Sequence, residues 1–275
     1  MPLSPTSPLR EPSAPPAPLP PRARDVLGVP LALIDYGRTL DWMDAMVAAR
    51  ARGYVCVAAV HTVMVCQEDA ELRDAVLRAS FTVPDGQPLV WAMNALGEHL
   101  PTRVYGPELM ERACARAART GARVYLYGGR TEGALVQLTL NLRRRHPGLK
   151  VVGGWSPPHR ALTPGEQAWV AGEIDRVDPD LVFVGIGVPK QEKWMAAMRP
   201  QLAAPVLLGV GAAFDFHAGL VPQAPGWMQA VGLEWLYRLG QEPRRLWRRY
   251  ARYNPRFVAG FARQYASHRR RPPKQ

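Results

Sequence analysis

The stretch L-V-F-V-G-I-G-V-P-K-Q-E-K-W-M-A-A-M occupies residues 181–198 and decides the expected fold. Its first four residues are apolar, and such a short run is typical of a buried strand. Glycines at 185 and 187 follow, and residues 190–199 then have helical character. This order indicates one unit of a parallel sheet that is covered by helices. Because ligands of such sheets bind outside the carboxyl ends of the strands, the loops after strands are where chemistry is expected.

The same order recurs along the chain. Further strands are predicted over residues 54–60, 122–127, 150–152 and 206–208. Further helices are predicted over residues 40–52, 69–79, 88–96, 107–119, 131–145 and 164–177. The alternation predicts an α/β fold, with a Rossmann-like, mostly parallel sheet, helices on both of its faces, and a basic helical appendage at the C-terminus.

Composition divides the 275 residues into three parts. Nine of the first 24 residues are proline, which is excluded from helix interiors and central strands, so residues 1–25 are predicted to be a disordered tail. Residues 26–233 are predicted to form the α/β domain, and residues 234–275 a basic, aromatic-rich, membrane-associating helical appendage. The sequence contains no run of 18 or more apolar residues, which is the length that spanning a bilayer requires. The three cysteines have no C-x-x-C spacing and are expected to be buried, reduced thiols.

The positive charge is concentrated near the C-terminus. Of the net charge of +12, residues 234–275 contribute +10, from 12 basic and 2 acidic residues. A helix is predicted to start at Pro243 and to be interrupted at Asn254-Pro255, with Asn254 capping a second helix. Arginines beside an aromatic stripe are typical of a helix in a membrane interface. The arginines assigned to anionic lipid or to a lipid diphosphate are Arg238, Arg244, Arg245, Arg248, Arg249 and Arg252.

Two other interpretations of this basic segment are open. In one, the aromatic residues pack on the domain and the arginines are solvated. In the other, basic and aromatic residues together bind single-stranded nucleic acid. No nucleic-acid-binding motif accompanies the segment, so nucleic acid is not an expected partner.

Three predicted strands end in glycine-rich loops, at residues 128–129, 185–187 and 209–211. Glycine lets a backbone approach a ligand closely, and a following helix N-terminus attracts phosphate. None of the loops has the G-x-G-x-x-G pattern, and no P-loop lysine follows at the required spacing. The sequence therefore does not support a nicotinamide dehydrogenase or a P-loop NTPase.

Asp85 lies in V-P-D-G-Q-P, directly after a short apolar run. Its carboxylate either points into the crevice at the strand end or serves as an ordinary Asp-Gly turn residue. Arg103 is likewise either a phosphate clamp or a solvated surface residue. The D-x-D sequence at residues 178–180 has the form of a metal motif, but it precedes a strand, so we interpret it as a turn and expect no metal.

Several longer segments occur together in one order and change these expectations. They are V-P-D-G-Q-P-L-V-W (83–91), R-V-Y-G-P-E-L (103–109), Y-G-G (127–129), G-I-G-V-P-K-Q-E-K-W (185–194), G-V-G-A-A-F-D-F-H-A-G (209–219), A-P-G-W (224–227) and G-L-E-W-L-Y-R-L-G-Q-E-P-R-R-L-W-R-R-Y (232–250). From about Val29 to Tyr250 the chain resembles the WecG/TagA/CpsF family of glycosyltransferases, also called glycosyltransferase family 26.

This resemblance implies an inverting transfer that needs no metal ion or other cofactor. It implies a UDP-sugar donor, such as one carrying N-acetylmannosamine, and a polyprenyl-diphosphate-linked saccharide acceptor. The location it implies is cytoplasmic, peripheral on the inner face of the cell membrane. By the family pattern Asp85 is the catalytic carboxylate, and Arg103 and Gln191 have supporting roles. A carboxylate is a suitable general base for the acceptor hydroxyl.

A set of substrate-binding residues is predicted around these three. They are His61, Thr62, Gly128, Gly129, Gly185, Gly187, Lys190, Glu192, Gly211 and Asp215. For Glu192, a second acid and a first-turn glutamate that favours the helix dipole are both open. For Asp215, binding a sugar hydroxyl and a structural hydrogen-bonding role are both open. Lone histidines such as His61 and His217 are more often structural than catalytic.

The chain departs from the family pattern after the first core strand. Family members often have T-x-N there, where this chain has Ala59-Val60-His61-Thr62. The donor is therefore not assumed to carry N-acetylmannosamine, and another hexose for exopolysaccharide assembly is equally consistent with the sequence. A non-catalytic protein that binds nucleotide-sugar or lipid diphosphate stays open as the alternative. Whether the chain forms homo-oligomers is also left open.

Overall fold

The computed structural model describes residues 15–230 and 232–270. The strands are β1 (Ala23–Val26), β2 (Val29–Ala32), β3 (Gly53–Ala58), β4 (Phe81–Pro84), β5 (Arg123–Gly128), β6 (Lys150–Trp155), β7 (Leu181–Gly185) and β8 (Val206–Gly209). The helices are α1 (Tyr36–Ala48), α2 (Val60–Val65), α3 (Ala70–Leu77), α4 (Gln87–Ala95), α5 (Gly106–Thr120), α6 (Glu132–Arg145), α7 (Pro164–Arg176), α8 (Lys190–Met198), α9 (Ala213–Ala218), α10 (Gly226–Ala230), α11 (Glu234–Gln241) and α12 (Pro243–Arg270).

The strands form one sheet in the order β1-β2-β4-β3-β8-β7-β5-β6. Every neighbouring pair is parallel except β1 and β2, which confirms the predicted Rossmann-like, mostly parallel sheet. The hairpin of β1 and β2 was not predicted. Its turn residues Leu27 and Gly28 both have positive φ, as the favoured two-residue hairpin turns require. Strand β1 begins at Ala23, so regular structure starts before the predicted end of the tail at residue 25.

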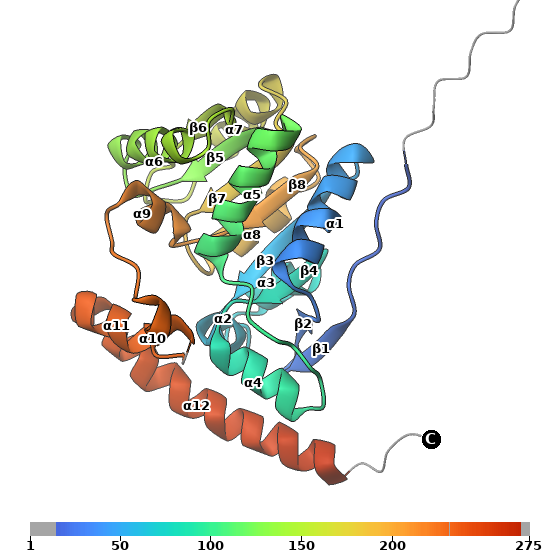
Figure 1. Ribbon diagram of the computed structural model, residues 1–275, viewed down its shortest axis with the longest axis vertical. Helices are drawn as coiled ribbons and strands as arrows, with labels where there is room; N and C mark the ends of the chain where they lie inside the picture. The colour runs from blue at the N-terminus through green and yellow to red at the C-terminus, as the bar shows by residue number, and fades with distance from the viewer. Residues whose placement is uncertain (1–14, 231, 271–275) are drawn as a thin grey trace, which may run out of the picture.

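Alternate side chains of the central strands enter two separate cores. In β7, Leu181 and Phe183 pack in the core with α1, α5, α6 and α9, whereas Val182 and Val184 pack in the core with α3, α4, α7 and α8. Successive strand side chains point to opposite faces, so a strand that is apolar throughout is buried on both sides. The predicted arrangement of helices on both faces is therefore confirmed (Figure 1).

Helix α12 lies across one end of the molecule, beside α11 and against α2 (Figure 1). It runs without a break from Pro243 to Arg270, so the predicted interruption at Asn254-Pro255 is wrong. Proline removes one helical hydrogen bond and normally breaks or kinks a helix interior. Here the side chains of Leu246 and Phe257 are buried, and burial of such side chains contributes about 1.5–3 kcal/mol each. Packing of the helix against the domain thus outweighs the loss at Pro255.

The aromatic stripe of α12 faces the protein. The Phe257 side chain belongs to the core under α3 and α8, and Tyr253, Phe261 and Tyr265 pack against that core. Their rings follow one another, with centroids 6.2 Å apart for Phe257 and Phe261 and 6.3 Å apart for Phe261 and Tyr265. Of the interpretations left open for this segment, packing of the aromatic residues on the domain is the one observed.

Within residues 15–230 and 232–270, no helix combines the length and the apolar character that crossing a bilayer requires.

Candidate active site

A cavity of about 770 Å³ lies at the carboxyl edge of the sheet, where the loops after β3, β4, β5, β7 and β8 meet. This is the edge at which parallel α/β sheets bind ligands. The predicted residues that line it are His61, Thr62, Asp85, Gly129, Gly185, Gly187, Lys190, Gln191, Gly211, Asp215, Arg238 and Arg249. Of the residues predicted to be catalytic or substrate-binding, Arg103, Gly128 and Glu192 lie outside this lining.

Asp85 is held at the end of β4 by two backbone contacts. Its carboxylate Oδ1 accepts a hydrogen bond of 2.6 Å from the backbone N–H of Gly106, the first residue of α5. Its own N–H donates to the carbonyl oxygen of Ala58, at 2.8 Å. A helix N-terminus stabilises a nearby negative charge, so the start of α5 both orients and stabilises this carboxylate.

The pKa of Asp85 is raised above its ordinary value of 3.8, chiefly because the carboxyl group is desolvated. The nearby positive charge of Arg103 and the hydrogen bond from Gly106 oppose this rise, and the negative charge of Glu234 adds to it. A carboxylate with a raised pKa takes up a proton more readily, as a general base must.

Arg103 lies behind the cavity wall. Its guanidinium NH2 group donates to Glu234 Oε2 at 2.7 Å, and its Cζ lies 4.3 Å from the centroid of the Tyr105 ring. The Arg103 and Glu234 side chains are only 11% and 9% exposed. Interpretation of Arg103 as a solvated surface residue is therefore wrong, and the residue instead acts on Asp85 through its charge.

Glu234 was not predicted as a site residue. It is the first residue of α11, and its ion pair with Arg103 fixes the appendage to the wall of the cavity. The available signal was its place in the specific G-L-E-W-L-Y-R segment, which begins at Gly232.

Two of the arginines assigned to anionic lipid or to a lipid diphosphate line the cavity. Arg238 of α11 lies over the Phe216 ring, with its Cζ 5.5 Å from the centroid, and its positive charge lowers the pKa of Asp85. Its Nε is buried and has no hydrogen-bond partner among the residues that the structure describes. Arg249 of α12 also lines the cavity. The appendage thus contributes two positive charges to the cleft.

Three other arginines of that set, Arg244, Arg248 and Arg252, are not part of the cavity lining. The side chains of Arg244 and Arg248 are exposed. Arg252 forms an ion pair of 2.9 Å with Glu68. The side chain of Arg245 lies outside what the structure describes.

His61 occupies the position of the altered T-x-N pattern and connects the cavity to α12. Its ring meets the Tyr253 ring edge-on, with centroids 5.2 Å apart. Burial, together with the positive charge of Arg249, lowers its pKa to about 4. A neutral imidazole therefore lines the cavity at this position. Thr62, the next residue of α2, is buried.

Packing accounts for two of the predicted phosphate-binding glycines. A Cβ on Gly128 would lie 2.5 Å from the carbonyl oxygen of Gly185, and a Cβ on Gly185 would lie 2.5 Å from the Phe214 ring. No side chain fits at either position, so both glycines are required by close contact inside the protein. At Gly187, φ is +79° and nothing lies within 4 Å of a Cβ position, which leaves its backbone open to the cavity.

Asp215 forms a two-point ion pair with Arg130, at 3.0 and 2.9 Å. Arg130 also lies 3.5 Å from Glu242, which connects α9 to the start of α12. Asp215 therefore has the structural role that the sequence left open, at a position that still lines the cavity. Lys190, at the start of α8, is exposed and also lines the cavity.

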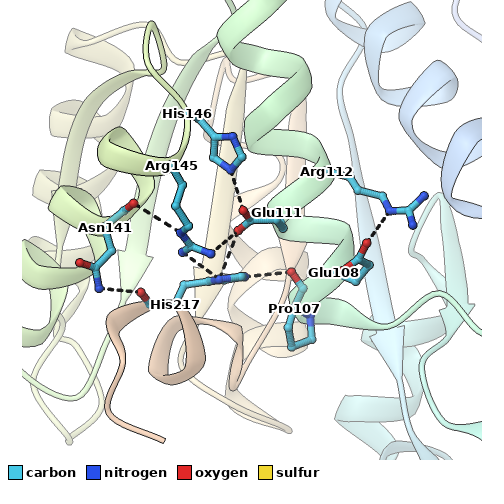
Figure 2. A network of polar contacts seen from close by, with 8 residues as sticks. All are labelled: Pro107, Glu108, Glu111, Arg112, Asn141, Arg145, His146 and His217. Atoms are coloured by element: carbon cyan, nitrogen blue, oxygen red, sulfur yellow. Dashed lines mark hydrogen bonds and ion pairs between the residues drawn. The ribbon is translucent and has the colours of Figure 1, made fainter. Parts of the chain in front are cut away.

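A buried histidine fixes the start of α5 (Figure 2). His217 of α9 is 6% exposed, and its Nε2 lies 2.9 Å from the carbonyl oxygen of Pro107, the second residue of α5. Its Nδ1 lies 3.1 Å from the guanidinium NH2 of Arg145 in α6, which itself pairs with Glu111 of α5 at 2.6 Å. Burial lowers the pKa of His217. Its contacts give the ring a structural role, because they tie together α5, α6 and α9 around the Asp85 anchor.

The D-x-D sequence lies far from the cleft in the fold. Asp178 and Asp180 precede β7, as predicted, and pair with Arg50 at 2.8 and 3.3 Å. Among the described residues, no group of three or more histidine, cysteine, aspartate or glutamate side chains is placed to hold a metal ion.

An anchored carboxylate, with arginines on the wall of a cleft at the carboxyl edge of a parallel sheet, is the arrangement that a glycosyltransferase with a phosphorylated leaving group requires. The chain belongs to the WecG/TagA/CpsF family of glycosyl transferases, whose family model matches residues 24–271.

Three similar proteins carry the same name, N-acetylglucosaminyldiphosphoundecaprenol N-acetyl-beta-D-mannosaminyltransferase. The Bacillus subtilis (strain 168) protein is 30% identical over 66% of this chain and 68% of its own length. The Bacillus spizizenii protein is 33% identical over 64% of this chain and 66% of its own length. The Staphylococcus aureus (strain MRSA252) protein is 31% identical over 60% and 63%. The chain thus spans about two thirds of the length of these relatives.

Proposed function

We propose that the protein transfers a sugar from a UDP-sugar to a saccharide carried on a polyprenyl diphosphate, with inversion and without a metal ion. The names of its relatives describe transfer of N-acetyl-β-D-mannosamine to N-acetylglucosaminyldiphosphoundecaprenol. The donor sugar is N-acetylmannosamine or another hexose, because His61 replaces part of the family pattern beside the cleft. The product serves the assembly of a cell-surface polysaccharide or exopolysaccharide.

The observation that carries the proposal is the placement of Asp85. Its carboxylate lies in the cleft lining and is oriented by the first amide of α5. In the reaction, Asp85 accepts the proton of the acceptor hydroxyl as that oxygen attacks the anomeric carbon. The bond between the anomeric carbon and the phosphate oxygen breaks at the same time, and UDP departs from the opposite face of the sugar.

Positive groups around the cleft would stabilise the departing diphosphate. Arg238 and Arg249 line the cleft from the appendage, and Lys190 lines it from α8. The backbone at Gly187, in the same lining, leaves space for a ligand to approach closely. Fixed positive charges and N–H groups that meet developing negative charge are a large source of catalysis, and here they would take the place of a metal ion.

A donor panel tests this function. Full-length protein is incubated in EDTA with UDP-N-acetylmannosamine, UDP-N-acetylglucosamine, UDP-glucose or UDP-galactose, with and without a lipid-diphosphate-linked N-acetylglucosamine, and released UDP is measured. We expect one donor to give UDP release that depends on the acceptor and is insensitive to EDTA. Loss of release in EDTA with recovery on adding magnesium would contradict the metal-free mechanism. Binding of a UDP-sugar with no release on any acceptor would favour the non-catalytic alternative.

We further propose that the outer surface of the appendage docks on the anionic inner face of the cell membrane. Trp235, Leu236 and Trp247 are exposed there, beside the exposed arginines Arg244 and Arg248. Exposed aromatic and basic side chains suit a lipid interface. A lipid-linked acceptor also requires the cleft, which the appendage borders, to lie near the bilayer.

Charge removal tests this docking without loss of the buried Leu246 and Phe257, which truncation would remove. We expect the double variant Arg244→Ala, Arg248→Ala to bind phosphatidylglycerol vesicles about 25-fold more weakly in sedimentation, since each basic residue near such a surface contributes about 1 kcal/mol. The control is Arg176→Ala, an exposed arginine on α7. Unchanged sedimentation of the double variant would show that this surface does not dock.

A further inference from the structure

The second and third residues of helix α8 are polar and buried. Gln191 is 2% exposed and Glu192 is 0% exposed. Burying polar groups costs free energy unless hydrogen bonds compensate. Gln191 lines the cleft, whereas Glu192 lies outside the lining. Glu192 therefore does not touch a ligand itself, and the interpretation of this residue as a second acid in the reaction loses its geometric basis.

Glu192 determines which way the Gln191 amide points. The amide Nε2 donates to Glu192 Oε1 at 2.8 Å. In this arrangement the amide nitrogen faces Glu192, and the carbonyl Oε1 faces the other way. That carbonyl oxygen lies near Gly211 in the lining of the cleft, where an added Cβ would be 3.3 Å from it.

The glycines after β8 make room for this amide. A Cβ on Gly209 would lie 3.2 Å from Gln191 Nε2 and 2.7 Å from the end of the Met195 side chain. The sequence pattern indicated that the 209–211 loop approaches phosphate. The structure instead shows that these glycines allow the Gln191 side chain to lie flat against the end of the strand.

Two buried oxygens of this pair, Gln191 Oε1 and Glu192 Oε2, lack a hydrogen-bond partner among the described residues, and only Gln191 belongs to the cleft lining. Buried acceptors without a partner are uncommon in native proteins, and each costs about 1–3 kcal/mol. A hydroxyl or amide N–H of a bound sugar would supply the missing donor.

We propose that Glu192 is a positioning residue that holds the Gln191 carbonyl oxygen towards the cleft, where it accepts a hydrogen bond from an O–H or N–H of the bound sugar. This inference rests on the proposed sugar transfer. It assigns Gln191 an acceptor role towards the ligand and predicts discrimination against sugars that lack a donor group at that position.

The surroundings of Glu192 allow this role in both of its protonation states. The titratable groups that face it are the thiols of Cys56 and Cys66, whose pKa values are raised by burial and by Glu192 itself. Burial raises the pKa of Glu192 to about 7, and its bond from Gln191 opposes that rise. Both the carboxylate and the neutral acid keep an oxygen that accepts from Gln191. A glutamine at this position keeps one as well.

Three variants test the proposal: Glu192→Gln, Glu192→Leu and Gln191→Leu. Steady-state kcat and KM for the donor and for the acceptor are measured, together with the dissociation constant of the UDP-sugar by calorimetry. We expect Glu192→Gln to stay within about twofold of the wild type. We expect Glu192→Leu to lose about tenfold in kcat/KM, the effect of one hydrogen bond to the ligand. The substrate whose KM rises identifies which sugar contacts Gln191.

A merely structural role would give a different pattern. Replacing a buried glutamate by leucine is expected to leave the melting temperature unchanged or raised, so an activity loss without destabilisation points to positioning. In a double-mutant cycle, Glu192→Leu should cause no further loss once Gln191 is leucine.

The proposal is overturned if Glu192→Leu retains wild-type kinetics and UDP-sugar affinity. It is also overturned if Glu192→Gln lowers kcat/KM as much as Glu192→Leu does. Full additivity of the kcat/KM losses of Glu192→Leu and Gln191→Leu in the double variant would overturn it as well. Absence of turnover by the wild type would instead reject the proposed function, and calorimetry on the same variants would still test the positioning.

Discussion

Replacement of Asp85 by asparagine lowers kcat for sugar transfer by about 10²–10⁴-fold, the usual contribution of a general base. Asparagine has nearly the same shape and keeps an oxygen that accepts from the Gly106 amide, the contact that anchors Asp85. It cannot take up the proton of the acceptor hydroxyl. We therefore expect KM for the donor to change little, while single-turnover transfer becomes slow.

The matched control is Asp178→Asn, which alters an exposed aspartate whose 2.8 Å ion pair with Arg50 lies before β7, away from the cleft. That variant should retain wild-type kcat. Wild-type turnover in Asp85→Asn, or an equal loss in both variants, would remove Asp85 from the role of base.

The wild-type pH profile gives the same assignment a second test. The pKa of Asp85 is raised above 3.8, mainly by burial, and the base is active only when ionised. Activity is therefore present above that raised pKa and is lost as the pH falls through it. The acid limb of kcat/KM should lie above pH 3.8 and should be absent from the residual activity of Asp85→Asn.

Replacement of Arg238 by glutamine lowers kcat/KM by about 10²–10³-fold, the usual effect of removing one group that stabilises transition-state charge. Arg238 lines the cleft, and its buried Nε has no partner among the described residues. Its charge also lowers the pKa of Asp85. Loss of the guanidinium thus weakens stabilisation of the departing diphosphate and moves the acid limb of the profile to higher pH.

Arg244→Gln is the matched control, because Arg244 belongs to the same basic appendage and its side chain is exposed. Kinetics should be measured with a short-chain acceptor in detergent, so that membrane binding does not limit the rate. An equal effect of the two substitutions would mean that the appendage acts only through its overall charge and not through Arg238 at the cleft.

The α/β fold could be predicted because its strands carry a strong local signal. Residues 181–184 are apolar throughout, which is the pattern of a strand buried on both faces, and the helices between strands begin and end near their predicted bounds. The hairpin of β1 and β2 could not be predicted in the same way, since each strand has only four residues and follows a proline-rich segment.

Which arginines of the appendage lie at the cleft and which lie in solvent depends on tertiary packing. The arginines at 238, 244, 248 and 249 are alike in sequence, yet the structure places two at the cleft and two in solvent. Pro255 predicted an interruption because local geometry disfavours proline in a helix, whereas burial of Phe257 keeps α12 continuous. Neither the placement of these arginines nor the continuity of α12 could be predicted from local sequence patterns.

The glycine-rich loops at the site also show that a local sequence pattern does not reveal why a residue is required. Gly128 and Gly185 fit a phosphate-binding pattern, but contacts with a neighbouring strand and with Phe214 account for both. Asp85 could be located through its strand-end turn and the family resemblance. Its anchor at Gly106 and the pair of Arg103 with Glu234 link residues that are 21 and 131 positions apart, so only the fold brings them together.

The most direct test of sugar transfer by an Asp85 base is mass spectrometry of the acceptor after incubation with the donor panel in EDTA. For the wild type, we expect a lipid-diphosphate-linked N-acetylglucosamine to gain the mass of one sugar residue, with one UDP released for each sugar added. We expect Asp85→Asn to give only a small fraction of that product in the same time. Folded wild-type protein that binds a UDP-sugar but leaves the mass of every acceptor unchanged would contradict sugar transfer.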